Sequence, residues 1–390
     1  MEQIRLGERL RLAREHARLS QTEAAKALGI TSAALSQYEA GKRRVDALTL
    51  DRLGRRYGTP LGFFFGQDAA RPDWEEALRA MATPFSAATK AGIVDLVAHL
   101  RALEELYRCT DTPLPMPQHP PFGPLPEVAY RDKDVLAYAE QVRQHYALGT
   151  APLPGLREFL EGQGYLVFTI PLGQEVPTIS GLYFAHPALG PVIAINGDQA
   201  YGRRSFTMAH EFTHALFHYD RPAVLCRTHD PRPLEQFADR FASYFLMPRL
   251  ALHEQVRLRG METVNRPEEV VHLARYFDVS YGAMLHCLRT ERRLSGSTDA
   301  FIAVKPIALA KALGYTPSPY EFGVRPLPIE ERFPRVFVEL ALRAAREDRL
   351  SLRRIAELLG ISDIELEERL YLDEEGGAEE TEAELAAATA

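Results

Sequence analysis

The stretch His210-Glu211-Phe212-Thr213-His214 places two imidazole side chains four residues apart, with a carboxylate between them. On a helix, four residues make just over one turn, so both rings project from one face and can hold one metal ion. A catalytic zinc ion needs three protein ligands and one open position for water. The spacing therefore predicts a zinc site with one ligand still to be found.

The residues around this stretch predict a helix that follows several strands. Apolar side chains recur at helical spacing over 206–217, and Ser205 is the expected N-cap. Upstream, the segments 165–170, 181–184 and 191–195 are predicted as strands. Strands followed by a metal-bearing helix indicate an α+β domain.

A second helix is predicted over 234–248, because its apolar residues recur at helical spacing and a proline closes it. Glu235 lies at its beginning. Asp239 falls one turn later on the same face, where it can accept the N–H of a metal-bound imidazole. The third ligand is therefore best sought on this helix.

The segments 206–211 and 235–248 resemble the ImmA/IrrE family of zinc metallopeptidases, whose pattern is HExxH on one helix and E…(N/D)xFA…LMP on a second. The resemblance implies a site for one Zn²⁺ per protomer, with the ligands His210, His214 and Glu235. It also implies that Glu211 is the general base. Zinc lowers the pKa of bound water, and a carboxylate on the ligand helix can take that proton and pass it to a leaving amine.

Other side chains near the site leave alternatives open. In the pattern HExxHxxGxxH/D, Asp220 would be the third ligand, but Phe217 stands where a glycine is needed. His218 continues the row of the two histidines, and we expect it, like Asp239, to support a ligand, because three ligands along one helix cannot surround a tetrahedral ion. Cys226, in the loop between the helices, either blocks the open position or is an ordinary loop thiol. A purely structural helix remains an alternative, although it would bury two histidines and a glutamate at a cost.

Short helical patterns separated by turns fill the amino-terminal region. Ser20 and Glu23 form a capping-box pattern, and Gly29 ends the helix that follows. Thr31 or Ser32 caps the next helix. Two short helices joined in this way indicate a helix-turn-helix.

The segment LSQTEAAKALGITSAALSQYEAGKRR, residues 19–44, resembles the XRE-type (Cro/C1 repressor-like) DNA-binding domain, and the likeness extends over 1–66. Helices at 48–57 and 60–65 would complete an all-α domain of five helices. Small polar residues on the second helix of the motif can enter the major groove. The expected DNA-binding residues are Gln21, Ser32, Ala33, Ser36, Gln37, Lys42, Arg43 and Arg44.

Charge supports DNA contact in this region. Residues 1–66 carry 12 Lys and Arg against 7 Asp and Glu, a net +5, in a chain whose formal net charge is −7. A basic segment in an acidic protein suits the phosphates of a double-stranded DNA operator. Leu35 and Tyr38 are expected to face the domain core. The alternative is a helix-turn-helix that contacts only proteins.

The length of 390 residues exceeds one typical core, so the predicted fold class is multidomain and mainly α. Seven prolines between Pro113 and Pro126 predict a stiff linker. The expected parts are a helix-turn-helix domain at 1–66, a helical connector and Pro-rich linker at 67–126, a central α+β zincin-like metallopeptidase domain with a small sheet at 127–294, a C-terminal helical docking or dimerisation region at 295–370 and an acidic tail at 371–390.

The last ninety residues carry two further features. The stretch 351–362 echoes a small helix-turn-helix, for which docking or dimerisation is the expected role and a second DNA reader the alternative. The tail at 371–390 holds seven acids and no Lys or Arg, which predicts disorder.

The chain has three isolated cysteines, which form no CxxC motif: Cys109, Cys226 and Cys287. Neither a signal segment nor an apolar run long enough to span a bilayer is evident in the sequence. We therefore expect a soluble, cytoplasmic, nucleoid-associated prokaryotic protein with no membrane partner.

Together these features predict a DNA-binding transcriptional regulator with a zinc-dependent endopeptidase domain, which cleaves a helix-turn-helix repressor in a stress or mobile-element response. Its expected partners are an operator, a protein substrate and a second copy of itself in a homodimer. The alternatives are a regulator whose zinc domain is a non-proteolytic sensor or structural module, and an antitoxin-like partner of a toxin.

Overall fold

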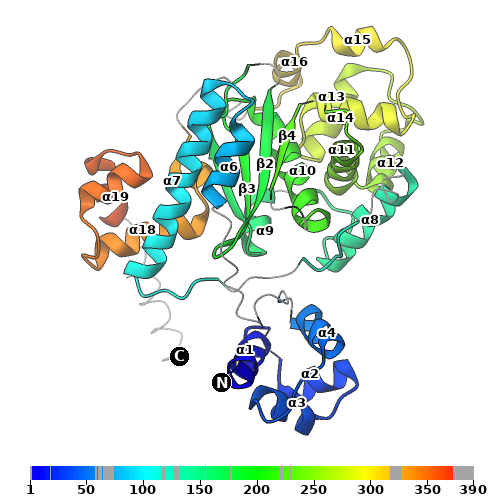
Figure 1. Ribbon diagram of the computed structural model, residues 1–390. Coiled ribbons are helices and arrows are strands. Elements are labelled where there is room, and N and C mark those ends of the chain that lie inside the picture. The colour runs from blue at the N-terminus through cyan, green and yellow to red at the C-terminus, as the bar shows by residue number, and fades with distance from the viewer. Residues whose placement is uncertain are drawn as a thin grey trace, which may run out of the picture. The chain divides into compact units, whose positions relative to one another are not determined.

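The structure is a computed structural model, and the residues that it describes are 2–17, 19–57, 59, 64, 74–115, 120–125, 132–153, 155–175, 178–219, 221, 223–228, 230–316 and 327–371. They are mainly helical with one small sheet, which confirms the predicted fold class (Figure 1). The chain divides into two compact units, Met1–Ile93 with Pro115–Pro326, and Val94–Leu114 with Leu327–Ala390.

Four helices form the described part of the amino-terminal region, namely α1 (Glu2–His16), α2 (Gln21–Leu28), α3 (Ser32–Glu39) and α4 (Ala47–Tyr57). Leu35 and Tyr38 are buried in their shared core, as predicted. A buried ion pair joins Arg14 to Glu39, with 2.6 Å between Nε and Oε1. The predicted fifth helix at 60–65 lies mostly outside the described residues.

The turn between α2 and α3 follows directly from local sequence. The Glu23 N–H donates to Ser20 Oγ at 3.2 Å and the Ser20 N–H donates to Glu23 Oε2 at 2.8 Å, which confirms the capping box. Gly29 ends α2 with a φ of 67°, a left-handed conformation that favours glycine. Thr31, rather than Ser32, caps α3.

The sheet has four strands in the order β1-β3-β2-β4, namely β1 (Leu166–Ile170), β2 (Ile179–His186), β3 (Gly190–Asn196) and β4 (Ala223–Arg227). β1 pairs with β3 in parallel, and the other pairs are antiparallel. The three predicted strands are confirmed. The expectation that Cys226 lies in a loop is wrong, because the five residues around it pair with β2 as an edge strand.

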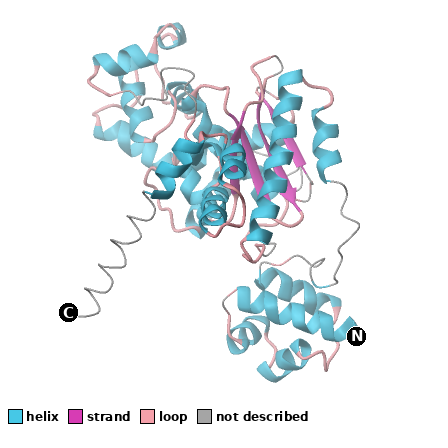
Figure 2. Ribbon diagram, turned by 90° about the vertical axis from the view of Figure 1, so that its left-hand side faces the viewer, coloured by secondary structure: helices cyan, strands magenta, loops and turns pink. Residues whose placement is uncertain are grey.

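Helices flank both faces of this sheet (Figures 1 and 2). Tyr183 of β2 belongs to the core that includes α10 (Arg204–Phe217), whereas the next residue, Phe184, meets Trp74 of α6 (Trp74–Ala82) with 5.9 Å between ring centroids. Successive side chains of a strand point to opposite faces, so each of these strands contributes to two packed layers.

The further described helices before residue 327 are α7 (Ala87–Cys109), α8 (Asp132–His145), α9 (Leu156–Gly162), α11 (Pro233–Leu246), α12 (Arg249–Leu258), α13 (Pro267–Tyr276), α14 (Tyr281–Thr290), α15 (Thr298–Ile302) and α16 (Pro306–Ala312). α10 begins at Arg204, because the 3-10 turn η2 (Tyr201–Arg203) runs directly into it. Ser205 therefore lies inside the helix and the predicted N-cap is wrong.

The second unit contains the later part of α7 with α17 (Ile329–Arg332), α18 (Arg335–Arg346), α19 (Leu352–Leu359) and a helix at 363–371. Among the described helices, none is both long and apolar enough to cross a membrane. The predicted acidic tail, apart from Tyr371, lies outside the described residues.

Candidate metal centre and DNA-binding helix

Two packed helices bring the expected ligand atoms to one point. On α10, His210 and His214 lie one turn apart with 3.2 Å between their Nε2 atoms. Glu235 of α11 places Oε2 at 3.1 Å from His210 Nε2 and at 3.7 Å from His214 Nε2. Ligands at about 2.0 to 2.1 Å from a tetrahedral zinc ion are about 3.3 Å from one another. The three separations therefore fit one zinc-sized ion.

A fourth donor belongs to the same group. Cys226 lies on edge strand β4 and is buried. Its sulfur and the donor atoms of His210, His214 and Glu235 all lie within 4.8 Å of one another. Two helices and a strand therefore surround this point, with donors that suit zinc.

Each histidine has a partner on its other ring nitrogen. His210 Nδ1 lies 2.9 Å from Asp239 Oδ1, and His214 Nδ1 lies 2.9 Å from His218 Nδ1. Such contacts orient a ring and leave Nε2 facing the common point. The structure thus places Asp239 and His218 behind the two histidines, and burial and His214 lower the pKa of His218 to about 2.

Arg232, which belongs to neither metal-binding motif, orients the carboxylate of Glu235. Arg232 Nη2 donates to Glu235 Oε1 at 3.0 Å, while Arg232 also pairs with Asp230 at 2.9 Å. Glu235 therefore presents Oε2 to the histidines. The spacing Asp-x-Arg-x-x-Glu at the start of a helix is the sequence signal that could have indicated this arrangement.

Glu211 lies fully buried beside the donors. Its Oε2 accepts a hydrogen bond from the Cys226 thiol at 3.3 Å, whereas its Oε1 has no hydrogen-bond partner. A Cβ atom at Gly181 of β2 would lie 2.8 Å from Glu211 Oε1, so only glycine leaves room for this carboxylate. A glycine inside a predicted strand is the sequence signal for such a close approach.

Burial and charge shift the pKa values of the group in opposite directions. Burial disfavours charged His210, but hydrogen bonds to Asp239 and Glu235 outweigh it and raise the pKa of His210 to about 10. Burial raises the pKa of Glu211 to about 8 and lowers that of His214 to about 4. Burial opposes the ionisation of Glu235, yet the two histidines hold its pKa well below the usual range.

These shifts describe a site that attracts positive charge. The ring of His210 lies between the carboxylates of Asp239 and Glu235, and the Glu211 carboxylate is buried close by, so the group favours a bound proton or cation. A divalent cation can take the place of a proton at such ligands, because metal binding to them releases protons. The donor set and its charge therefore fit a metal ion. Asp220, the alternative third ligand, lies outside the described residues.

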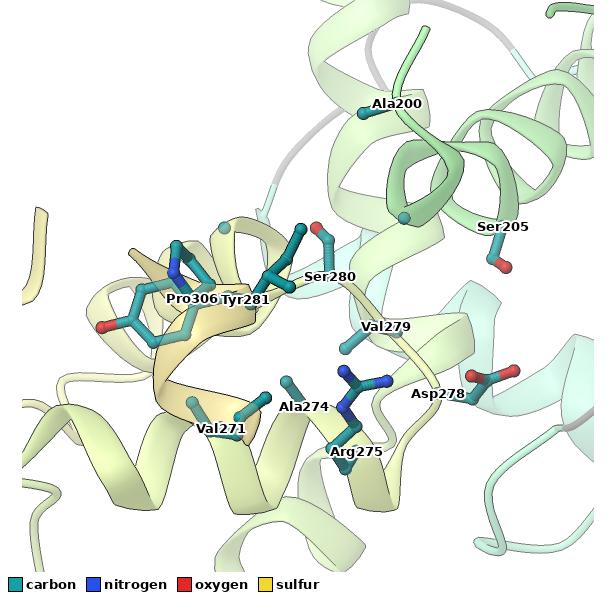
Figure 3. Close-up of a pocket in the computed structure, with 14 residues that line it drawn as sticks. Ala200, Ser205, Val271, Ala274, Arg275, Asp278, Val279, Ser280, Tyr281 and Pro306 are labelled. Atoms are coloured by element: carbon teal, nitrogen blue, oxygen red, sulfur yellow. The ribbon is translucent and has the colours of Figure 1, made fainter. Parts of the chain in front are cut away.

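A pocket of about 420 Å³ lies elsewhere in the same unit (Figure 3). Val271 and Ala274 of α13 contribute apolar lining, Arg275 adds a charged group, and Ser205 of α10 lies at another side. None of the four donors is among the described residues that line it. The pocket therefore does not mark the metal-binding group.

The amino-terminal helices present the expected DNA-binding residues in two ways. Exposed or half-exposed positions on and after α3 carry Ser32, Ala33, Ser36, Gln37, Lys42, Arg43 and Arg44. Gln21 instead donates from Nε2 to Glu39 Oε2 at 2.8 Å, beside the buried pair of Arg14 and Glu39. α3 is thus an accessible helix, whereas Gln21 helps to fix the helix before it.

Comparisons with known proteins agree with this division. Residues 160–289, which contain α10, β4 and α11, match the peptidase family model described as the IrrE N-terminal-like domain. Residues 5–62 match a helix-turn-helix domain. A comparison with curated proteins gave no match.

Among solved structures, the crystal structure of ComR from Streptococcus suis aligns with 96% of this chain and 96% of its own, at 11% identity. Its TM-score of 0.16 is too low to carry an argument. The two family models instead match the regions in which the structure shows the accessible helix α3 and the buried donors. The chain therefore joins an amino-terminal helix-turn-helix domain to an IrrE-like domain of the metallopeptidase type.

Proposed function

We propose that this protein is a DNA-binding regulator whose IrrE-like domain is a zinc-dependent endopeptidase. The observation that carries the proposal is the convergence of two imidazoles and a carboxylate on one point, with Glu211 buried beside them. When bound there, zinc would act as a Lewis acid and lower the pKa of water toward neutrality. His210, His214 and Glu235 are the proposed ligands.

Glu211 is the proposed general base. Its Oε1 has no other hydrogen-bond partner, so it can accept the proton of an attacking water and return it to the leaving amine. Burial raises its pKa to about 8, which suits a group that must both take and give a proton near neutral pH. Asp239 and His218 are the proposed groups that hold the ligand rings in place.

We propose a repressor of the same helix-turn-helix class as the substrate, in a stress or mobile-element response. A DNA-binding head would concentrate the peptidase at an operator where such a repressor also binds. Repressor-type heads read two half-sites of double-stranded DNA as a dimer, so a cytoplasmic homodimer is part of this proposal.

Glu211→Gln tests the catalytic role, because it removes the proton acceptor and keeps the side-chain size and both imidazoles. We expect normal folding, zinc content and operator binding, with cleavage of repressors encoded beside this gene reduced by about 100-fold or more. The matched control is Glu254→Gln on the exposed surface of α12, which should cleave as the parent does. Repressors left intact both by the zinc-loaded parent and by zinc-loaded Cys226→Ala, which lacks the fourth donor, would contradict the proposal.

One observation favours a second candidate function. Four protein donors around one point are typical of structural zinc sites, whereas catalytic sites keep one position open. In that case the domain is a zinc-stabilised or metal-sensing module of the regulator. Zinc removal would then change operator binding, while Glu211→Gln would change nothing.

A further inference from the structure

Cys226 is the one member of the donor group that the proposed peptidase mechanism does not use. Its sulfur is buried within 4.8 Å of both imidazole nitrogens and of the Glu235 carboxylate. A second observation at the same point is the buried Glu211 carboxylate, whose Oε1 has no hydrogen-bond partner and whose Oε2 faces the thiol at 3.3 Å. Thiolate is a preferred zinc ligand alongside imidazole and carboxylate.

We infer that Cys226 binds the metal ion as a fourth ligand and thereby holds the peptidase in a latent state. This inference rests on the proposed function and concerns the regulation of that same site. With sulfur bound, the tetrahedral positions are filled by protein and no position remains for water. On metal binding the thiol loses its proton, and Glu211 Oε2, which already accepts the thiol hydrogen bond, is placed to receive it.

The strand pairing explains why the sulfur and the general base meet. Cys226 lies opposite Gly181 in the register of β4 and β2, and a Cβ at Gly181 would meet Glu211 Oε1. The main chain of Cys226 is held further by Ser180, whose Oγ donates to the Cys226 carbonyl at 3.3 Å. One pair of strands therefore sets the positions of both groups.

The same strand provides a route out of the latent state. β4 has five residues, lies at the edge of the sheet and pairs with β2 as its only neighbour in the described strand order. A small displacement of such a strand breaks few backbone hydrogen bonds. Withdrawal of Cys226 would open the fourth position and release Glu211 from the thiol.

Cobalt substitution tests the ligation without relying on activity. The full chain is stripped of metal and loaded with one equivalent of Co²⁺, and the near-ultraviolet absorption is recorded. We expect a sulfur-to-cobalt charge-transfer band in the parent and in the control Cys109→Ala, and its loss in Cys226→Ala. In the zinc form, X-ray absorption should show one sulfur at about 2.3 Å, absent from Cys226→Ala.

Metal affinity gives a second readout. Loss of an outer-shell partner lowers the metal affinity of a site by roughly tenfold or more, and loss of a direct ligand should lower it by at least as much. Cys226→Ala should therefore release its zinc to a chelator at a correspondingly lower chelator concentration than the parent does. Cys226→Ser, with a poorer oxygen donor of similar size, should behave in the same way if the alanine variant is unstable.

The outcomes separate this inference from the proposed function. Cobalt bound by nitrogen and oxygen alone, with no sulfur band in the parent, would overturn the inference and leave the peptidase proposal standing. A parent chain that binds neither zinc nor cobalt would overturn the proposed function itself. A band that persists in Cys226→Ala would assign the sulfur to another cysteine and also overturn the inference.

Latency is measured with β-casein as a generic unfolded substrate. Zinc-loaded Cys226→Ala should cleave it at least about tenfold faster than the parent and Cys109→Ala, and the added change Glu211→Gln should abolish that gain. A parent with the sulfur band that cleaves as fast as Cys226→Ala would overturn latency.

Discussion

Glu235 is the residue on which the metal site depends most directly. Its two oxygens have different tasks, because Oε1 is held by Arg232 while Oε2 faces both histidines. A carboxylate free to rotate would present either oxygen, or neither, to an ion. Because Arg232 fixes the orientation of this carboxylate, Oε2 stays directed at the two histidines and the three donors can bind one metal ion together.

Glu235→Ala should therefore lose most of the bound zinc. One equivalent per chain is expected in the parent, and removal of a protein ligand leaves a pair that competes poorly with buffer. Atomic absorption of the dialysed proteins measures the difference, with Glu254→Ala as the control for loss of an exposed glutamate. Equal zinc content in Glu235→Ala and the parent would refute the ligand assignment.

At the scale of elements, β2 is the strand that makes room for the general base. Gly181 lies where β2 is irregularly paired with β4, and a Cβ there would also lie 2.8 Å from the Ala194 carbonyl oxygen. Both close approaches must be relieved if a side chain is added. The strand and the catalytic carboxylate are therefore coupled through one glycine.

Gly181→Ala should reduce the free energy of unfolding by about 1–3 kcal/mol, the usual cost of overpacking, and should displace Glu211. Denaturant unfolding and repressor cleavage are the two measurements. Gly162→Ala is the matched control, because a Cβ at that helical position meets nothing within 4 Å. If the two variants unfold alike, the close approach to Glu211 does not constrain this strand.

The helix-turn-helix pattern occurs at two places with opposite charge. The turn after α19 repeats the turn after α2, with a left-handed glycine, Gly360, and a serine, Ser362, whose Oγ accepts the N–H of Glu365 at 3.1 Å. The following helix at 363–371 carries four acidic residues and one arginine, whereas α3 is followed by Lys42, Arg43 and Arg44. Acidic groups repel phosphate, so this second motif does not suit DNA.

Substitutions in the amino-terminal helix-turn-helix should distinguish contacts to base edges from contacts to phosphates. Gln37→Ala should relax operator choice, because a glutamine at a base edge contributes roughly 1–3 kcal/mol of discrimination. Arg43→Ala should weaken binding to all sequences and reduce the salt dependence by about one phosphate contact. Binding to operator and random duplexes across salt concentrations distinguishes the two variants, and the same behaviour in both would mean that α3 is not the reading helix.

At the scale of the whole molecule, the second compact unit contains a buried histidine. In the second unit, the ring of His99 on α7 packs at 4.9 Å from Phe333 and 6.1 Å from Phe337, measured between centroids. Burial lowers the pKa of His99 to about 4, with Asp95 opposing and Arg332 adding to the effect. The folded unit therefore holds this histidine neutral where the unfolded chain would bind a proton.

The second unit should lose stability as pH falls from about 6.5 to about 4, and this contribution should not change further below that range. A folded pKa below the unfolded value means that only the unfolded state takes up the proton in this window, at a total cost of up to about 3 kcal/mol. His99→Gln should flatten that part of the pH profile of denaturant unfolding. The exposed His286→Gln serves as the control, and an unchanged slope in His99→Gln would contradict the assignment.

Local sequence alone determined the short-range features of this protein. Spacing of four residues on a helix places His210 and His214 on one face, and Ser20, Glu23 and Gly29 define a helix and its end through their own backbone contacts. Such interactions involve neighbours within one or two turns, so the sequence predicts them directly.

Tertiary structure alone decided which distant residues share the metal site and the second unit. Cys226 and Gly181 meet Glu211 only because β4 pairs with β2 above α10, and residues 94–114 join a unit with residues after 327. These contacts depend on strand register and on packing between elements far apart in the chain. No periodicity within one segment encodes them, because the free energy that selects them comes from burying the whole set of elements together.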